Sequence, residues 1–228
     1  MRVFIYSHIN TKKIKRLLLK NGFAVSNYKP DIIISYGGDG TTLSAERKYP
    51  EIPKLVVKTS KISHPYEIDE KMLSLTLKKI KKGRYKIIEE IKLVGIFRNK
   101  KLVGLNEIQI HTKYPTKALR FSVYLNEKAF ENLIGDGVVV STPFGSTAYY
   151  KSLGCKSFKR GIGIGFNNIH NEKMKCMRIK SEDYVKIKIL RGCGILAADN
   201  NPKMYTLNPG DEIEIKKYEK PAKFIQVL

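Results

Sequence analysis

Hydrophobic and polar positions follow two different patterns along the chain. Over residues 1–82, short apolar runs alternate with stretches in which apolar residues recur at helical spacing, as Ile14, Leu17 and Leu18 do. The strands and helices expected there are, in alternation, 2–6, 11–22, 31–36, 41–48, 53–58 and 68–80. Strands that alternate with helices predict a parallel α/β sheet for this part of the chain.

From residue 83 onward the pattern becomes mostly β. Short runs rich in Val, Ile and Tyr follow one another at close intervals, which is typical of a sandwich or layered sheets. We expect 86–97 and 102–111 to form two long strands of a hairpin around the polar residues 98–101. The chain is therefore predicted to hold an α/β domain over 1–82 and a β-rich domain over 83–221.

Composition agrees with a globular protein, at 42% hydrophobic and 28% charged residues. No apolar run approaches the roughly 18 residues of a membrane span. The N-terminus lacks the layout of a signal peptide, so a cytoplasmic protein is expected. Cys155, Cys176 and Cys193 form no CxxC pair, which favours buried or free thiols over a disulfide or a zinc site.

The charge is strongly basic, with a net charge of +22 and a pI near 9.8. Such a field attracts polyanions, and nucleic acid is one candidate. The lysines are scattered, however, and no helix-turn-helix or zinc signature accompanies them. A lysine-rich solvated surface and a phosphorylated ligand are therefore both compatible with this charge.

The segment DIIISYGGDGTTL, residues 31–43, runs from an apolar strand into a glycine loop. Glycine amides at the carboxyl end of a strand, followed by a helix N-terminus, suit a phosphate group. The loop is not a P-loop, because GxxxxGK[ST] is absent and no lysine lies within it. The loop residues are Gly37, Gly38, Asp39, Gly40 and Thr41.

Asp39 is the only charged side chain in this loop. A carboxylate beside bound phosphates could accept the proton of an attacking hydroxyl or hold Mg²⁺. Both roles belong to phosphoryl transfer to an alcohol. The alternative is an ordinary Asp-Gly turn.

Two further motifs carry candidate chemistry. Residues 135–154, GDGVVVSTPFGSTAYYKSLG, contain the glycine-flanked Asp136 and a hydroxyl-rich loop in which Ser146 or Thr147 could cap a helix that begins at Ala148. Tyr149 offers a ring on which a base could stack; a structural turn and cap is the alternative.

The other motif, Asn106-Glu107, interrupts an otherwise apolar strand, so both side chains need polar partners. Those partners are either internal or the polar edge of an adenine or ribose.

Together, the three motifs resemble those of the NAD kinase family. GGDGT at 37–41, NE at 106–107 and DGVVVSTPFGSTAYYKSLG at 136–154 occur in that family's order. Diacylglycerol and sphingosine kinases share GGDGT, but in them an Asn-Glu pair follows almost at once. A lipid or sphingoid kinase and a non-enzymatic nucleotide- or nucleic-acid-binding protein are the alternatives.

The resemblance implies phosphorylation of the adenosine-ribose 2′-hydroxyl of NAD to NADP by ATP or polyphosphate, with Mg²⁺ or another divalent cation. Asp39 would be the general base and positioning group, and Gly37, Gly38, Gly40 and Thr41 would bind the donor phosphates. No residue set is assigned to a metal site of its own. The residues implied for NAD binding are Asp39, Gly40, Asn106, Glu107, Asp136, Thr147, Ala148, Tyr149 and Ser152.

The resemblance also implies a homodimer or homotetramer with the NAD site near a subunit interface, and a C-terminal strand, 222–228, that completes the first domain. The sequence departs from the family in 57–69, where a GxLGFL-like segment is usual. A common DG near the C-terminus reads Ala198-Asp199-Asn200. The first departure leaves the phosphoryl donor and the choice between NAD and NADH open.

Overall fold

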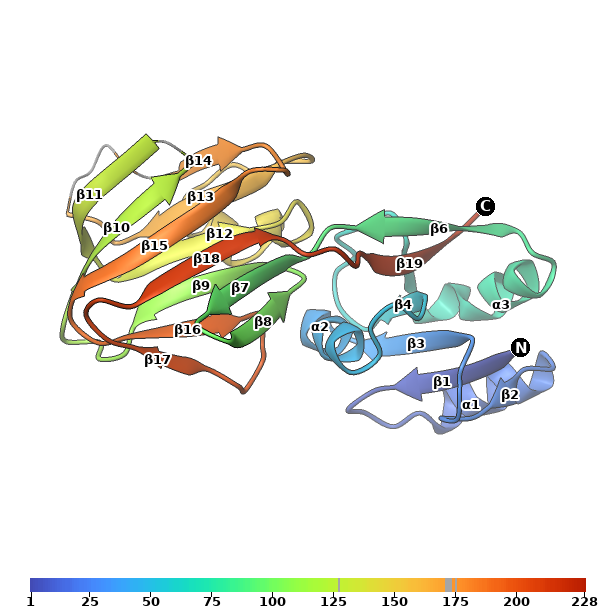
Figure 1. Ribbon diagram of the computed structural model, residues 1–228. Coiled ribbons are helices and arrows are strands. Elements are labelled where there is room, and N and C mark those ends of the chain that lie inside the picture. The colour runs from blue at the N-terminus through green and yellow to red at the C-terminus, as the bar shows by residue number, and fades with distance from the viewer. Residues whose placement is uncertain (127, 171–173, 175) are drawn as a thin grey trace. The chain divides into compact units, whose positions relative to one another are not determined.

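The computed structural model describes residues 1–126, 128–170, 174 and 176–228 and contains two compact units (Figure 1). The first comprises Met1–Glu90 and Pro221–Leu228, and the second Ile91–Lys220. The predicted fold class is confirmed, since the first unit is α/β and the second is built from antiparallel strands. The boundary expected at residue 83 is wrong. Residues 85–90 form an edge strand of the first unit, and hydrophobic periodicity does not tell which sheet a strand will join.

The first unit is a twisted sheet in the order β2-β1-β3-β4-β19-β6, with the short β5 pairing beside β19 on β4. All pairs are parallel except β19 with β6. The C-terminal strand therefore lies in the first unit. Its elements are β1 (Arg2–Tyr6), α1 (Lys12–Lys20), β2 (Ala24–Val25), β3 (Ile32–Gly37), α2 (Asp39–Lys48), β4 (Lys54–Lys58), β5 (Glu67–Asp69), the 3₁₀ helix η1 (Glu70–Met72), α3 (Leu73–Lys81), β6 (Tyr85–Glu90) and β19 (Ala222–Val227).

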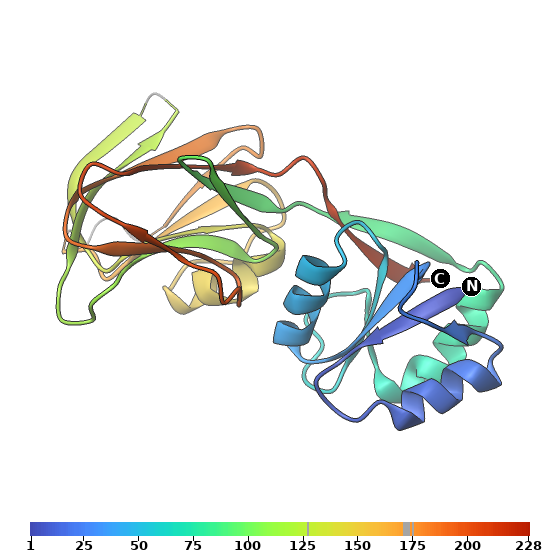
Figure 2. The same cartoon turned by 60° about the horizontal axis from the view of Figure 1, so that its bottom comes forward.

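Helices cover both faces of this sheet (Figure 2). Leu18 of α1 and Leu77 of α3 pack in one buried cluster with Ile34 of β3, whereas Ala45 of α2 packs with Ile33 on the opposite face. Two helix boundaries differ from the prediction: α2 begins at Asp39, and the helix expected from 68 begins at 73 because 67–69 extend along β4. None of the helices in the described part of the chain is long and apolar enough to cross a membrane.

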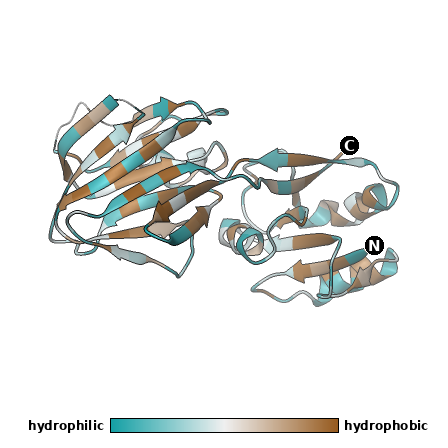
Figure 3. Cartoon of the chain, viewed as in Figure 1, coloured by the Kyte–Doolittle hydropathy of each residue, from teal (hydrophilic) through white to brown (hydrophobic). Residues whose placement is uncertain are grey.

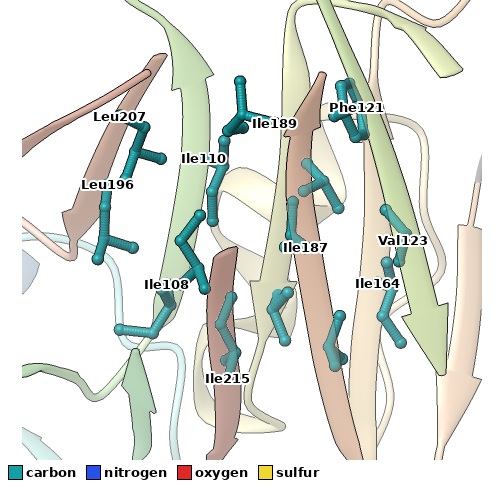
Figure 4. Close-up of a cluster of buried hydrophobic side chains, with 14 of the residues drawn as sticks. Ile108, Ile110, Phe121, Val123, Ile164, Ile187, Ile189, Leu196, Leu207 and Ile215 are labelled. Atoms are coloured by element: carbon teal, nitrogen blue, oxygen red, sulfur yellow. The ribbon is translucent and has the colours of Figure 1, made fainter. Parts of the chain in front are cut away.

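The second unit contains two six-stranded antiparallel sheets, in the orders β11-β10-β15-β18-β7-β8 and β14-β13-β12-β9-β16-β17. Hydrophobic and hydrophilic segments alternate along many of the strands (Figure 3). The inward-facing side chains of both sheets form one buried cluster, in which Ile187 and Ile215 of one sheet meet Ile108 and Leu196 of the other (Figure 4). Its elements are β7 (Leu93–Phe97), β8 (Lys100–Gly104), β9 (Glu107–Thr112), β10 (Leu119–Leu125), β11 (Lys128–Gly135), β12 (Gly137–Ser141), the 3₁₀ helix η2 (Phe144–Thr147), α4 (Tyr149–Ser152), β13 (Ile162–Asn167), β14 (Cys176–Ile179), β15 (Tyr184–Arg191), β16 (Gly194–Ala198), β17 (Tyr205–Leu207) and β18 (Glu212–Lys217).

The long hairpin expected over 86–111 is shorter in the structure. Only β7 and β8 pair as a hairpin, and the chain then turns so that β9 enters the other sheet. Asn106 therefore lies in the turn and not inside a strand. Gly104 permits this turn, because a Cβ there would lie 2.3 Å from the carbonyl oxygen of Glu107.

Two of the three cysteines form a disulfide, Cys155–Cys176, so the expectation of free thiols is wrong for this pair. Cys193 is a free, half-buried thiol. The β13–β14 register sets Cys176 opposite Gly165, and a Cβ on that glycine would lie 3.3 Å from Cys155 Sγ. The disulfide thus depends on the β13–β14 register and on the lack of a side chain at Gly165. Neither feature can be read from the spacing of the cysteines in the sequence.

Candidate active site

In the first unit, the glycine loop connects a fully buried strand to a helix. Every residue of β3 is buried up to Gly37, whose φ of +151° suits glycine. A Cβ on Gly37 would lie 2.5 Å from Thr41 Oγ1, so the loop also needs glycine for space. Asp39 is the first residue of α2, after Gly38 at the N-cap. The positive end of the helix dipole therefore lies at Asp39, where it favours a carboxylate and suits a phosphate.

A lysine that the sequence analysis missed reaches this loop from the neighbouring strand. Lys58 ends β4 and is the register partner of Gly37 on β3. Its Nζ donates to Asp39 Oδ1 and lies 3.6 Å from Glu67 Oε1. The lysine is 2% exposed, whereas the side chain of Asp39 is 70% exposed. The loop therefore presents a solvent-accessible carboxylate held by a buried cation.

The segment that departs from the family pattern surrounds this cation. The carboxylate of Glu67 accepts backbone hydrogen bonds from Ser63 (2.6 Å) and His64 (3.1 Å) through Oε2. The ring of His64 stacks on that of Tyr66, with centroids 5.4 Å apart. Burial lowers the pKa of His64, Glu67 opposes that shift, and the nearby Lys58 lowers the pKa further. Residues 58–67 thus place charged and titratable groups around Asp39.

In the second unit, Asp199 fixes the Asn106-Glu107 turn. Its carboxylate accepts backbone hydrogen bonds from Leu105 (2.7 Å), Asn106 (2.8 Å) and Glu107 (3.1 Å). Asp199 has a φ of +46°, a left-handed conformation that aspartate tolerates better than most residues. Its role is to hold the turn, which the pattern Ala198-Asp199-Asn200 alone did not reveal.

Glu107, the residue after Asn106, is a buried acidic residue. The residue is 6% exposed, and its Oε2 has no hydrogen-bond partner in the described part of the chain. Burial, followed by the charge of Asp199, raises the pKa of Glu107 to about 8. The carboxyl is therefore largely protonated near neutral pH and can donate a hydrogen bond to a ligand.

The hydroxyl-rich motif is hydrogen-bonded to the same turn. Thr142 donates its backbone N–H to the carbonyl of Asn106 (2.9 Å) and its hydroxyl to that of Leu105 (2.6 Å). The N–H of Gly145 donates to the Thr142 hydroxyl (3.0 Å). The motifs at 106–107 and 141–147, which are far apart in the sequence, thus form one rigid substructure.

The expected helix cap at Ser146 or Thr147 is wrong. Both residues belong to η2, and α4 begins at Tyr149 without a side-chain cap. The hydroxyl of Ser146 is instead engaged with the carbonyl of Pro143 (2.8 Å) and with the backbone of Phe158 (3.2 Å). A buried hydroxyl takes whichever partners it can reach, and here these lie across the loop.

The remaining candidate residues divide into a linked group and an exposed group. Asn167 donates to the Tyr149 hydroxyl (3.1 Å), and Asn168 donates to Asp136 Oδ2 (3.2 Å). The pKa of Tyr149 is raised by burial first and then by the charges of Asp136 and Glu107, which places these three side chains in one electrostatic neighbourhood. The exposed group consists of Thr147, Ala148 and Ser152.

A divalent cation could bind at this loop together with the phosphate groups of the donor. Within the ranges that the structure describes, no cluster of three or more His, Cys, Asp or Glu side chains could hold a metal ion. Mg²⁺ commonly binds through one or two carboxylates together with substrate phosphates, and Asp39 offers one exposed carboxylate. The residues present therefore suit a cation that arrives with the phosphoryl donor.

Replacing Glu107 by Gln should change the pH dependence of stability. Between pH 4.5 and about 8 the folded protein keeps a proton on Glu107 that the unfolded chain releases, so this group destabilises the fold increasingly as pH rises. We expect Glu107→Gln to gain stability relative to the wild type from about pH 5 to about pH 8.5, by at most about 5 kcal/mol. Urea unfolding of both proteins across this range measures the gain, and a difference that does not change with pH would contradict it.

The chain is similar to known proteins over most of its length. The ATP-NAD kinase C-terminal domain family matches residues 105–227. The NAD kinase of Lactobacillus johnsonii is 36% identical over 152 residues, which are 63% of this chain and 56% of that protein. The bifunctional NADP phosphatase/NAD kinase of Methanococcus maripaludis is 30% identical over 225 residues, covering 93% of this chain and 40% of that protein. The chain thus matches only about half the length of these relatives.

A solved structure extends the similarity to the fold of both units. The crystal structure of an NAD kinase from Archaeoglobus fulgidus in complex with ATP has a TM-score of 0.81 at 22% sequence identity, and the match covers 98% of this chain and 93% of that one. The family match spans more than half of the chain and includes both motifs of the second unit. The chain therefore belongs to the ATP-NAD kinase family.

Proposed function

We propose that this protein phosphorylates the adenosine-ribose 2′-hydroxyl of NAD to give NADP, with ATP or polyphosphate as donor. The observation that carries the proposal is the position of Asp39, an exposed carboxylate at the first residue of α2 in a glycine loop. Membership of the ATP-NAD kinase family supports it. A carboxylate so placed can take a proton from a hydroxyl that attacks a bound phosphate.

The proposed phosphoryl transfer forms one bond and breaks another. The 2′-oxygen forms a bond to the terminal phosphorus of the donor, and the bond from that phosphorus to the leaving phosphate breaks. The hydroxyl proton passes to Asp39. The loop residues Gly37, Gly38, Gly40 and Thr41 hold the donor phosphates at the positive end of α2. A divalent cation that arrives with the donor would be held mainly by the donor phosphates beside this loop, and it would neutralise part of their charge.

The second unit would bind the dinucleotide. Asn106 and the protonated Glu107 offer hydrogen bonds to its polar edges, and Asp136 and Tyr149 line the same neighbourhood. The aromatic ring of Tyr149 can stack on a base. The exposed residues Thr147, Ala148 and Ser152 are available to a ligand or to a second subunit. We accordingly propose a homodimer or homotetramer in which the dinucleotide site lies near a subunit interface.

The test is direct synthesis of NADP. Purified protein is incubated with NAD, ATP and Mg²⁺, and NADP is read out with an NADP-specific dehydrogenase. Parallel reactions replace ATP by polyphosphate and NAD by NADH, because the 57–69 segment differs from that of the family. NADP or NADPH in any of these reactions supports the proposal and identifies the substrates. Absence of product in all of them would refute it.

A further inference from the structure

We propose that Lys58 is a positioning residue for Asp39, which holds one oxygen of its carboxylate so that the other can accept the hydroxyl proton. The inference rests on the proposed function. It concerns the region in which the chain departs from the family's usual sequence, and Lys58 belongs to none of the motifs that carry the resemblance.

The sheet fixes where the ammonium group of Lys58 lies. Lys58 is the last residue of β4, a strand in which all five residues are buried, and it pairs in register with Gly37. Its side chain has no solvent exposure, so few rotamers remain open to it. Asp39 lies two residues beyond Gly37, and the ammonium meets its Oδ1. The buried side chain of Lys58 thus determines the orientation of the exposed Asp39 carboxylate.

Glu67 provides a second negative charge beside the ammonium group of Lys58, in addition to that of Asp39. Its side chain is 2% exposed, its Oε1 lies 3.6 Å from Lys58 Nζ, and two backbone N–H groups bind its Oε2. Lys58 therefore keeps a buried counter-charge when Asp39 becomes neutral on accepting a proton. It can go on donating to Oδ1 while Oδ2 carries the transferred proton.

A second lysine on the same strand provides a matched comparison. Lys54, four residues earlier on β4, is equally buried, and it contacts Glu46 near the other end of α2 and the carbonyl of Tyr49 (2.7 Å). Each lysine thus anchors α2, but only Lys58 reaches the carboxylate of Asp39. If both lysines served only to hold the helix, their removal would have similar effects on turnover.

The experiment compares Lys58→Met, Lys54→Met, Asp39→Asn and the double variant Lys58→Met/Asp39→Asn in the NADP-forming assay, with thermal melting of each. We expect Lys58→Met to lower kcat about 10- to 100-fold with KM values within about threefold, because misplacing a reacting group acts on the chemical step. The double variant should be no slower than Asp39→Asn within about threefold, since Lys58 acts through Asp39. Lys54→Met should keep kcat within about threefold of the wild type while it lowers the melting temperature.

Each contrary result has its own meaning. A normal kcat in folded Lys58→Met, or equal losses in both lysine variants, would reduce Lys58 to a structural role. A raised KM for the donor, with effects that multiply in the double variant, would mean that Lys58 contacts the donor phosphates instead. If Lys58→Met does not fold, Lys58→Gln provides a polar side chain that is uncharged and too short to hold Asp39 Oδ1 in the same place; it should still lower kcat, and a normal kcat would reduce Lys58 to a structural role. A wild type without activity would refute the proposed function itself, and the inference with it.

Discussion

Replacing Asp39 by Asn is expected to lower NADP formation at least 100-fold while the fold stays intact. General-base catalysis typically contributes 10²–10⁴-fold, and an amide of the same size cannot take the hydroxyl proton. The substitution is mild for the structure, because the side chain is 70% exposed and Asn retains an oxygen that can accept from Lys58. An acidic residue in the first turn of a helix contributes only about 0.3–1 kcal/mol at an exposed position.

The measurement is kcat and kcat/KM for both proteins, with circular dichroism and thermal melting as controls for the fold. A melting temperature near that of the wild type, together with the loss of turnover, would assign the effect to chemistry. Turnover near the wild-type level would remove Asp39 from the mechanism.

Replacing Gly145 by Ala is expected to lower the stability of the fold strongly. A Cβ at this position would lie 2.2 Å from the carbonyl oxygen of Asn106 and 2.5 Å from its carbonyl carbon and Cα. All three are backbone atoms, and Thr142 ties that backbone down through its contacts with Asn106 and Leu105. The clash cannot be relieved by a rotamer change, so the two motifs must separate. We expect a loss of at least about 3 kcal/mol in the free energy of unfolding.

Gly154→Ala is the matched control in the same unit. Gly154 has a φ of +83°, and nothing lies within 4 Å of a Cβ built there. It should therefore cost only the left-handed backbone conformation, about 1–2 kcal/mol. Urea unfolding gives both values, and dinucleotide binding should be lost in Gly145→Ala alone. Equal losses for the two variants would contradict the interlock between the motifs.

The sequence predicted those features that depend on local patterns. Alternating strands and helices indicated the α/β unit, and closely spaced β-branched runs indicated the β-rich unit. The DIIISYGGDGTTL segment forms the expected strand, glycine turn and helix, although the helix begins two residues earlier than expected, at Asp39. These features follow from side-chain periodicity and from glycine conformation, both of which can be read within a few residues.

Features that depend on long-range pairing were not predictable in this way. Lys58 reaches the glycine loop because β4 pairs with β3 in one particular register, and Asp199 reaches Asn106 across β16 and β9. The Cys155–Cys176 bond likewise depends on the β13–β14 register. A lysine at the end of a buried strand was nevertheless a usable signal. In a parallel sheet, the carboxyl ends of neighbouring strands meet at one edge.

The position of the new phosphate tests the central claim most directly. Purified wild-type protein is supplied with NAD, ATP and Mg²⁺, and the product is isolated and assigned by phosphorus and proton NMR, with ADP quantified alongside. The account predicts one phosphate on the 2′-oxygen of the adenosine ribose for each ADP formed. A phosphate on another hydroxyl, or ATP consumption without any phosphorylated dinucleotide, would contradict it.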